Sequence, residues 1–377
     1  MRLISKDANL KKLLLSKGFE PENIERFLNY SENMIFTFEK GNLDDHIKHI
    51  LMENGYHVIY NENEFFLSTT RENFNKTKCL IQDLLKDQDI CSFEENFSRI
   101  LLLKEGRKID LNKTNIMGIM NITPDSFYQG SRYQNLDAIQ EVSKKMIEDG
   151  ADIIDIGGES TRPFSEPITE EEEINRVIPA IKKIREINNN IPISIDTYRS
   201  RVAKLAIEAG ADIINDISGG LFDKEMFRVA ASLNVPIIIM HIKGTPKDMQ
   251  QNPYYDDVVK EIYEFFEMRI EDAIENGVKK ENIILDPGIG FGKRVEDNLE
   301  IIRRCDEFKS LGCPVLIGAS RKSTIGKVLG DLPPEERLEG TIAISVICAM
   351  KGIEFVRVHD VKENKRAVTM TNAIYNY

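Results

Sequence analysis

Residues 212–242 read DIINDISGGLFDKEMFRVAASLNVPIIIMHI, and this stretch decides the fold that the sequence predicts. Two short runs rich in isoleucine, 212–217 and 236–242, flank a segment of helical character. Neither run shows the alternation of apolar and polar residues that is typical of a strand with one face in water. Such strands, separated by a helix, indicate a parallel sheet that is covered on both faces.

The same arrangement continues on both sides of this stretch, where further apolar runs alternate with helical segments. The eight runs are 115–121, 152–157, 192–197, 212–217, 236–242, 283–287, 314–320 and 355–360. Eight strand-and-helix repeats over about 250 residues are typical of a closed (β/α)8 TIM barrel. A doubly wound open sheet is the structural alternative, but it usually has fewer strands and binds its ligand where the strand order reverses. The sequence therefore predicts an α/β barrel over residues 111–377.

Residues 1–110 have a different texture and contain nine of the 18 phenylalanines, a density that indicates a folded domain and not a linker. The expected elements are a helix at 9–17, a strand at 34–38, a helix at 44–53, a hairpin at 56–69 and a helix at 75–86. This mixture predicts a small α+β domain before the barrel. No role for this domain follows from its sequence.

Composition excludes several classes of function. A formal net charge of −12 argues against nucleic-acid and membrane binding, because both partners are anionic. Five cysteines without C-x-x-C spacing favour reduced thiols in a cytoplasmic protein over a disulfide frame or a zinc site. No secretory signal and no run of about 18 apolar residues is found, so no membrane-spanning segment is expected.

Polar side chains end nearly every apolar run, and in a (β/α)8 barrel the carboxyl ends of the strands hold the active site. These side chains are Asn121, Asp196, Asn215, Asp216, His241, Asp286, Ser320, Lys322, Arg357 and His359. A carboxylate after a strand is also often a helix cap, and we expect Asp216 and His241 to be structural.

The remaining residue types suggest a chemistry. Acceptors and one amide at 196, 215 and 286 suit the edge of a flat heterocycle, while cations at 322, 357 and 359 suit a polyanion such as a diphosphate. The neutral oxygen of Asn121 could join a Mg²⁺ ion that bridges diphosphate oxygens.

Eight motifs in order give the chain a family resemblance. They are MGIMNITPDSF at 117–127, DIGGESTRP at 155–163, SIDT at 194–197, NDISGG at 215–220, MHIKGTP at 240–246, DPGIGFGK at 286–293, GASRK at 318–322 and RVHD at 357–360. This series resembles the dihydropteroate synthases over residues 115–377. The resemblance implies a transferase of folate biosynthesis that joins a dihydropterin methyl diphosphate to 4-aminobenzoate, uses Mg²⁺, forms a homodimer and is a sulfonamide target.

The resemblance also implies residue roles. Catalytic roles fall on Asn121, Asp125, Arg357 and His359, with Asn121 as the metal ligand. Substrate binding falls on Thr161, Arg162, Pro163, Asp196, Asn215, Met240, Asp286, Phe291, Gly318, Ser320, Lys322, Arg357 and His359. One departure from the family pattern is Phe164, which replaces a glycine near the expected aminobenzoate entrance and bears on sulfonamide sensitivity.

Two other functions are compatible with part of these features. A corrinoid-linked methyltransferase would share the pterin-binding barrel, but it has no need of a diphosphate clamp. A barrel that binds pterin without turnover would not need the TPDSF segment or the full set of cations.

Overall fold

The computed structural model describes residues 2–4, 33–39, 45–54, 56–60, 64–70, 100–122, 132–159, 168–245, 249 and 252–375. The chain forms two compact units, one made mainly of Met1–Arg99 and the other mainly of Ile100–Lys309 and Cys313–Tyr375. Each unit is described by itself below.

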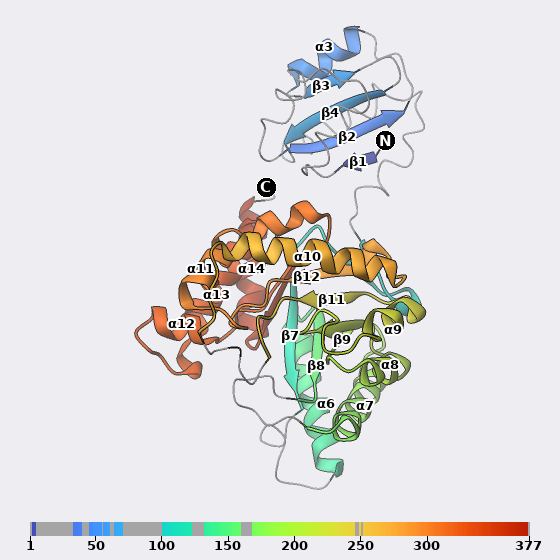
Figure 1. Cartoon of the computed structure of the whole chain (residues 1–377), viewed down its shortest axis with the longest axis vertical. Coiled ribbons are helices and arrows are strands. Elements are labelled where there is room, and N and C mark those ends of the chain that lie inside the picture. Colours follow the sequence, from blue (N-terminus) through green and yellow to red (C-terminus); the bar gives the residue numbers. More distant parts are fainter. Residues whose placement is uncertain are drawn as a thin grey trace. The chain divides into compact units, whose positions relative to one another are not determined.

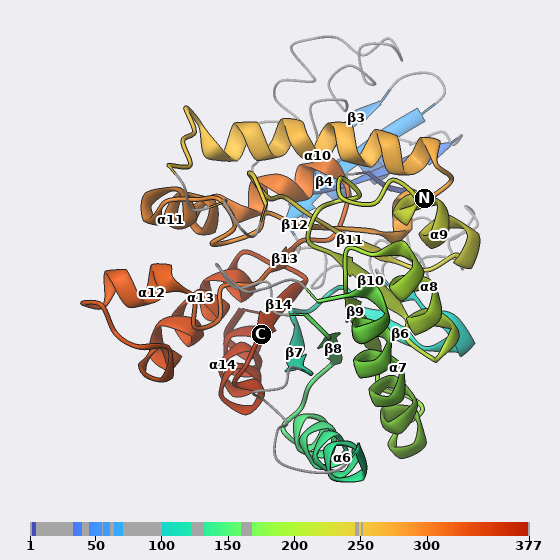
Figure 2. The same cartoon turned by 60° about the horizontal axis from the view of Figure 1, so that its bottom comes forward.

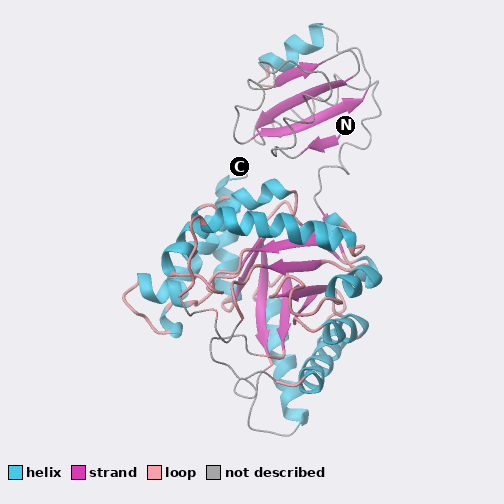
Figure 3. Cartoon of the chain, in the orientation of Figure 1, coloured by secondary structure: helices cyan, strands magenta, loops and turns pink. Residues whose placement is uncertain are grey.

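The smaller unit is built on an antiparallel sheet in the order β1-β2-β4-β3 (Figure 3). Its elements are β1 (Arg2–Ile4), β2 (Asn33–Glu39), α3 (Asp45–Glu53), β3 (His57–Tyr60) and β4 (Glu64–Thr70). The predicted strand, helix and hairpin are present, with Tyr60 opposite Phe65 at the hairpin turn. The helices predicted at 9–17 and 75–86 lie outside the described residues.

The larger unit is the predicted parallel barrel. Its strands are β7 (Asn115–Asn121), β8 (Ile153–Gly157), β9 (Ile193–Asp196), β10 (Ile213–Asp216), β11 (Ile237–Met240), β12 (Ile283–Asp286), β13 (Leu316–Ile317) and β14 (Phe355–Val358). They pair in the order β12-β11-β10-β9-β8-β7-β14-β13, and a parallel bridge between Leu285 and Val315 joins β12 to the segment leading into β13. The open-sheet alternative is therefore wrong.

Helices surround the strands (Figures 1 and 2). They are α6 (Arg132–Glu148), α7 (Glu170–Ile187), α8 (Ser200–Glu208), α9 (Met226–Leu233), α10 (Val258–Glu275), α11 (Val295–Arg303), α12 (Ser323–Val328), α13 (Leu338–Met350) and α14 (Val361–Tyr375), with the 3₁₀ turns η3 (Lys280–Asn282), η4 (Cys305–Leu311) and η5 (Pro334–Glu336). Thr169 caps α7 by accepting from the Glu172 amide. The four glutamates that follow stabilise the helix, because their negative charge lies at the positive end of its dipole. No helix among the described residues is long and apolar enough to span a membrane.

A hairpin closes one end of the barrel interior. It consists of β5 (Ile100–Leu102), η2 (Lys104–Gly106) and β6 (Lys108–Asp110). The hairpin belongs with the larger unit, whereas the predicted domain boundary at residue 110 placed it in the first domain. Leu101, Leu103 and Ile109 share one buried cluster with the inward-facing side chains of the strands. Polar residues lie at the opposite end of the barrel, where the strands end.

Strand register brings these polar residues to one level. Asn121 is paired with Gly157, Gly157 with Asp196, and Asp196 with Asn215, so four neighbouring strands finish together. Since alternate residues of a strand point to the same side, Asp155 lies one layer deeper beneath Gly157.

Candidate active site

Arg357 is the centre of the polar cluster at the strand ends. Its Nε donates to Asp155 Oδ2 at 2.6 Å, and its Nη2 donates to Asp196 Oδ2 at 2.7 Å. Burial disfavours the charged form, but the adjoining carboxylates outweigh burial and raise the pKa of Arg357 above its ordinary value. The guanidinium is therefore charged and fixed in orientation, while Nη1 takes part in neither contact.

For Asp196, unlike Arg357, burial outweighs the neighbouring opposite charge and disfavours the charged form. Its side chain is 12 % exposed, and burial raises its pKa to about 7. Attraction by Arg357 opposes this shift, whereas repulsion by Asp155 adds to it. Oδ2 is engaged by Arg357, and no hydrogen bond among the described residues uses Oδ1.

Asp155 was not predicted as a site residue from the sequence, since it lies inside a strand and not at its end. It is fully buried, and besides Arg357 it accepts from Asn215 Nδ2 at 3.4 and 3.3 Å. A charged residue in the middle of an apolar run was the available signal. Asp155 orients both Arg357 and the Asn215 amide, leaving Asn215 Oδ1 as an acceptor.

Asp286 stands across the barrel mouth at the end of β12. Burial raises its pKa, and the charge of Lys322 and the Gly288 amide oppose the shift. Gly288 N donates to Oδ1 at 2.8 Å. Oδ2 is 3.9 Å from the position that a Cβ would take at Gly318, so the missing side chain there keeps space open beside this oxygen.

Lys322, and not its neighbour Arg321, belongs to the site. Burial lowers the pKa of Lys322 to about 8, which leaves the ammonium largely protonated near neutral pH. Its Nζ donates to the Ile289 carbonyl and lies 4.4 Å from the centroid of the Phe291 ring. Arg321 instead forms a two-pronged ion pair with Asp360.

Gly157 opens the space between Asn121 and Asp196. A Cβ at Gly157 would lie 3.4 Å from Asn121 Oδ1 and 3.7 Å from Asp196 Cβ. The two side chains therefore border a common gap, which a Cβ at residue 157 would fill at ordinary contact distance.

The remaining described candidates border this cluster. Ser320 Oγ lies 3.0 Å from His359 Nδ1 and accepts from the His359 amide at 3.1 Å. Met240 is buried at the end of β11 in a cluster against which Phe291 packs. Asp125, Thr161, Arg162, Pro163 and Phe164 lie outside the described residues.

The two residues expected to be structural are held by the protein itself. Asp216 accepts from the amides of Ser218 and Gly220. His241 is buried beside Lys293, with 2.9 Å between Nδ1 and Nζ.

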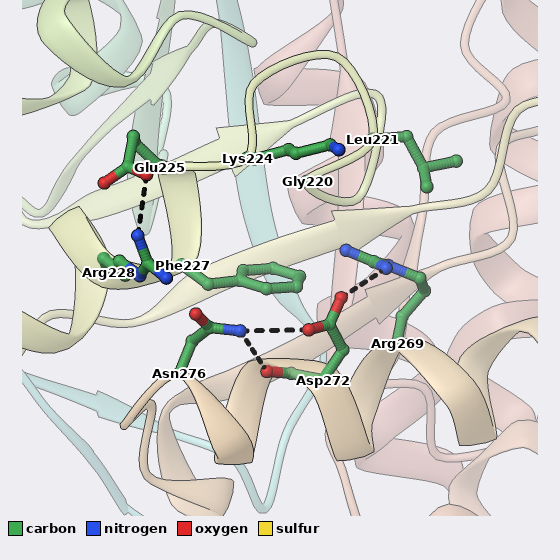
Figure 4. Close-up of a pocket in the computed structure, with 9 residues that line it drawn as sticks. All are labelled: Gly220, Leu221, Lys224, Glu225, Phe227, Arg228, Arg269, Asp272 and Asn276. Carbon is green, nitrogen blue, oxygen red and sulfur yellow. Dashed lines mark hydrogen bonds and ion pairs between the residues drawn. The ribbon is translucent and has the colours of Figure 1, made fainter.

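A hollow of about 360 Å³ lies outside the strand ends between the start of α9 and α10 (Figure 4). Its acids are committed to neighbours, because Asp272 accepts from Arg269 and Asn276, and Glu225 accepts from Arg228. None of the predicted site residues lines it. We therefore assign the active site to the strand ends.

No cluster of three or more His, Cys, Asp or Glu side chains with the arrangement of a metal site occurs within the described parts of the chain. Asn121 Oδ1, facing the gap at Gly157, is a neutral oxygen that could join an oxygen-bound cation.

Comparison with known proteins gives a consistent result. A family model described as pterin binding enzyme matches residues 117–359. The dihydropteroate synthase of Clostridium beijerinckii is 52 % identical over 263 residues, which cover 70 % of this chain and 94 % of that protein. The enzyme of Bacillus subtilis is 49 % identical over 264 residues, covering 70 % and 90 %.

Solved structures agree. The Yersinia pestis dihydropteroate synthase, in complex with a sulfonamide drug, superposes with a TM-score of 0.69 at 39 % identity and covers 74 % of this chain and all of that chain. The Xanthomonas albilineans enzyme with 4-aminobenzoic acid gives a TM-score of 0.68 at 39 % identity, covering 72 % and 97 %.

Proposed function

The chain belongs to the pterin-binding enzymes, and among them to the dihydropteroate synthases, and from this premise we propose how its barrel works. It is a transferase of folate biosynthesis that joins (7,8-dihydropterin-6-yl)methyl diphosphate to 4-aminobenzoate and releases diphosphate. One observation supports this most directly: acceptor oxygens and two cations face each other at the strand ends.

The pterin ring is proposed to lie against Asp196, Asn215, Asp286 and Lys322. Each of the two carboxylates has one oxygen committed to the protein and one uncommitted, and Asn215 adds its Oδ1. An aminopyrimidine edge presents N–H donors beside a carbonyl, which match these oxygens and the Lys322 ammonium respectively. Because carboxylates accept charge-assisted hydrogen bonds, this pairing is strong and specific.

The diphosphate is proposed to bind at Arg357 and His359. Arg357 is charged and has Nη1 available, and a guanidinium holds phosphate oxygens in a fixed geometry. The contact of Ser320 Oγ with Nδ1 holds the His359 ring in place.

Charge balance supports Mg²⁺ as the cofactor. Asp155, Asp196 and Asp286 offset the positive charge of Arg357 and Lys322, so a diphosphate bound here would need a further cation. Asn121 would hold the ion through Oδ1, with the other ligands from diphosphate and water, as Mg²⁺ prefers. The ion would supply charge neutralisation on the leaving group.

For aminobenzoate we propose a pocket bounded by Met240, Phe291, Gly318 and Ser320, and we expect Thr161, Arg162 and Pro163 to contribute to substrate binding. The Yersinia relative binds a sulfonamide drug, and we propose that this chain is also a sulfonamide target, with Phe164 as the position that modulates affinity.

In the reaction the bond between the pterin methylene carbon and the diphosphate oxygen breaks, and the electron pair leaves with diphosphate. The arylamine nitrogen then bonds to that carbon and loses a proton. Arg357 and His359 are proposed to spread the growing charge of the leaving group. No protein nucleophile is needed, so catalysis consists of positioning and electrostatic stabilisation, with Asp125 proposed to stabilise the cationic pterin.

A homodimer is supported by exposed apolar side chains on neighbouring helices. Between 38 and 62 % of the surface of each is exposed, and they are Val328, Leu329, Ile347, Met350, Met370 and Ile374. The last four lie on α13 and α14, which pack side by side (Figure 2). We expect Met370→Glu to shift the sedimentation coefficient toward that of a monomer, whereas Met268→Glu, at an equally exposed position on α10, leaves it unchanged.

A cytoplasmic location is proposed from the cysteines. Cys305, Cys313 and Cys348 are buried and form no disulfide, which fits a reducing compartment.

Diphosphate release by the full chain tests the function. The pterin diphosphate, 4-aminobenzoate and Mg²⁺ are supplied together and then omitted one at a time. Release that depends on all three supports the proposal, and pterin binding without release points to a binding barrel or a methyltransferase. Asp286→Asn is expected to weaken pterin binding by about 2–3 kcal/mol, since an amide donor then faces a donor. Asp306→Asn, outside the strand-end cluster, is the matched control.

A further inference from the structure

Lys293, the last residue of the DPGIGFGK motif, points into the protein and is 3 % exposed. Its Nζ lies 2.9 Å from His241 Nδ1, 2.9 Å from the Phe291 carbonyl and 3.3 Å from the His241 carbonyl. Three acceptors match the three N–H groups of an ammonium. One side chain thus fastens the loop after β12 to the end of β11.

The roles of the pair follow from its geometry. Two backbone carbonyls and His241 Nδ1 surround Lys293 Nζ, so Lys293 is the donor and a neutral His241 ring accepts at Nδ1 with its proton on Nε2. Burial lowers the pKa of both His241 and Lys293 well below their ordinary values, which agrees with a neutral imidazole.

Two glycines let the loop come close enough for this contact. Gly288 has φ of +68°, and a Cβ there would lie 2.1 Å from the His241 carbonyl oxygen. Gly292 has φ of +66°, and a Cβ there would lie 2.3 Å from the Lys243 carbonyl oxygen. The His241 amide also donates to the Asp286 carbonyl at 2.9 Å. The loop of residues 287–292 therefore packs directly against the backbone of residues 241–243.

The same loop holds Lys322. The Ile289 carbonyl accepts from Lys322 Nζ, and the Phe291 ring lies under that ammonium. Lys293 donates to the carbonyl of Phe291 and so fixes the backbone there. A shift of this backbone would move both the Ile289 carbonyl and the Phe291 ring, the two groups that contact Lys322.

We propose that Lys293 and His241 form a positioning pair that fixes the loop of residues 287–292 and thereby sets Lys322 and Phe291 for the substrates. This inference rests on the proposed synthase function, since it assigns the pair a role in that reaction. Neither residue touches the reacting atoms.

Lys293→Met keeps the length of the side chain and removes its donors. It is expected to lower kcat/KM for the pterin diphosphate by about 10- to 100-fold, the size of effect that a displacement of about 1 Å produces. The matched control is Lys365→Met, which removes an ammonium from an ion pair with Asp152 at the other end of the barrel and leaves kcat/KM unchanged.

Two substitutions of His241 separate positioning from packing. The Oδ1 of His241→Asn stands near the place of Nδ1 and can accept from Lys293, whereas His241→Leu fills space against Phe265, whose ring centroid is 4.8 Å from that of His241. Positioning predicts that the Asn variant retains most activity and the Leu variant loses it. A packing role predicts the reverse order.

A Leu variant as active as wild type, or an Asn variant no better than Leu, overturns the proposal. The His241 pair decides the matter alone if Lys293→Met does not fold. Wild type that releases no diphosphate contradicts the proposed function instead. In that case calorimetric binding of dihydropterin to the same His241 variants still tests whether the pair orders the loop.

Discussion

Replacing Asp196 by asparagine should change how the stability of the protein depends on pH. Burial, partly offset by Arg357, raises the pKa of Asp196 from 3.8 to about 7. Between these values the native carboxyl keeps a proton that the unfolded chain has lost. The contribution of Asp196 to stability is therefore complete below pH 4 and disappears as the pH rises through 7.

The magnitude follows from that shift. Each pH unit over which the native group is protonated and the unfolded group is not changes the free energy of unfolding by about 1.4 kcal/mol. From pH 5 to pH 7, where titration is half complete, the wild type should lose about 2 kcal/mol through this group. The side chain is only 12 % exposed, so screening by solvent reduces the figure little. The amide of Asp196→Asn does not titrate, so this variant should not show the loss.

Urea unfolding at pH 5, 6, 7 and 8 measures the effect, followed by circular dichroism because the chain has no tryptophan. The quantity of interest is the stability of Asp196→Asn minus that of wild type, in which other titrating groups cancel. It should increase by about 2 kcal/mol from pH 5 to pH 7 and level off above. Asp137→Asn on the exposed face of α6 should give a flat difference. A flat difference for Asp196→Asn as well would refute the electrostatic account of the site.

Three further substitutions test the packing that supports the site, each by urea unfolding. Gly288→Ala forces a Cβ against the His241 carbonyl and should lower the free energy of unfolding more than Gly106→Ala does. A Cβ at Gly106 meets no atom within 4 Å, so that variant should lose only the roughly 1–2 kcal/mol that the left-handed backbone costs. Equal losses in the two variants would contradict the close approach at Gly288. Ser194→Ala should raise stability by about 1 kcal/mol, because among the described residues the Ser194 hydroxyl is buried without a partner; a loss would indicate an unrecognised hydrogen bond. Asp212→Asn should cost about 3–5 kcal/mol, since it leaves Arg107 and Arg185 buried without their shared carboxylate, and a change under about 1 kcal/mol would show that the pair is solvated.

The barrel could be predicted because its eight strands are short, apolar and separated by helices, a pattern that depends only on local sequence. The hairpin of residues 100–110 could not be assigned from that pattern. Its leucines are buried only because the barrel interior receives them, and this contact joins segments distant in the sequence. Propensity alone carries no information on such packing.

The candidate site shows the same limit. Strand ends identified Asp196, Asp286 and Arg357, since polar residues after apolar runs are visible in the sequence. The prediction of Lys322 and not Arg321 rested on the resemblance to the family, because the strand end alone allowed either cation. In the structure the difference depends on Asp360, which pairs with Arg321.

The carboxylates of the site differ in how many of their oxygens accept hydrogen bonds from the protein, and this difference separates their roles. Both oxygens of Asp155 accept from the protein, since Arg357 engages Oδ2 and the Asn215 amide lies within 3.4 Å of both. Asp286 is different, because the Gly288 amide takes Oδ1 and no described group takes Oδ2. A carboxylate oxygen that the protein does not engage can accept from a donor that a substrate supplies. Asp155 is thus built to hold Arg357 in place, and the two carboxylates with an uncommitted oxygen are built to hold a ligand.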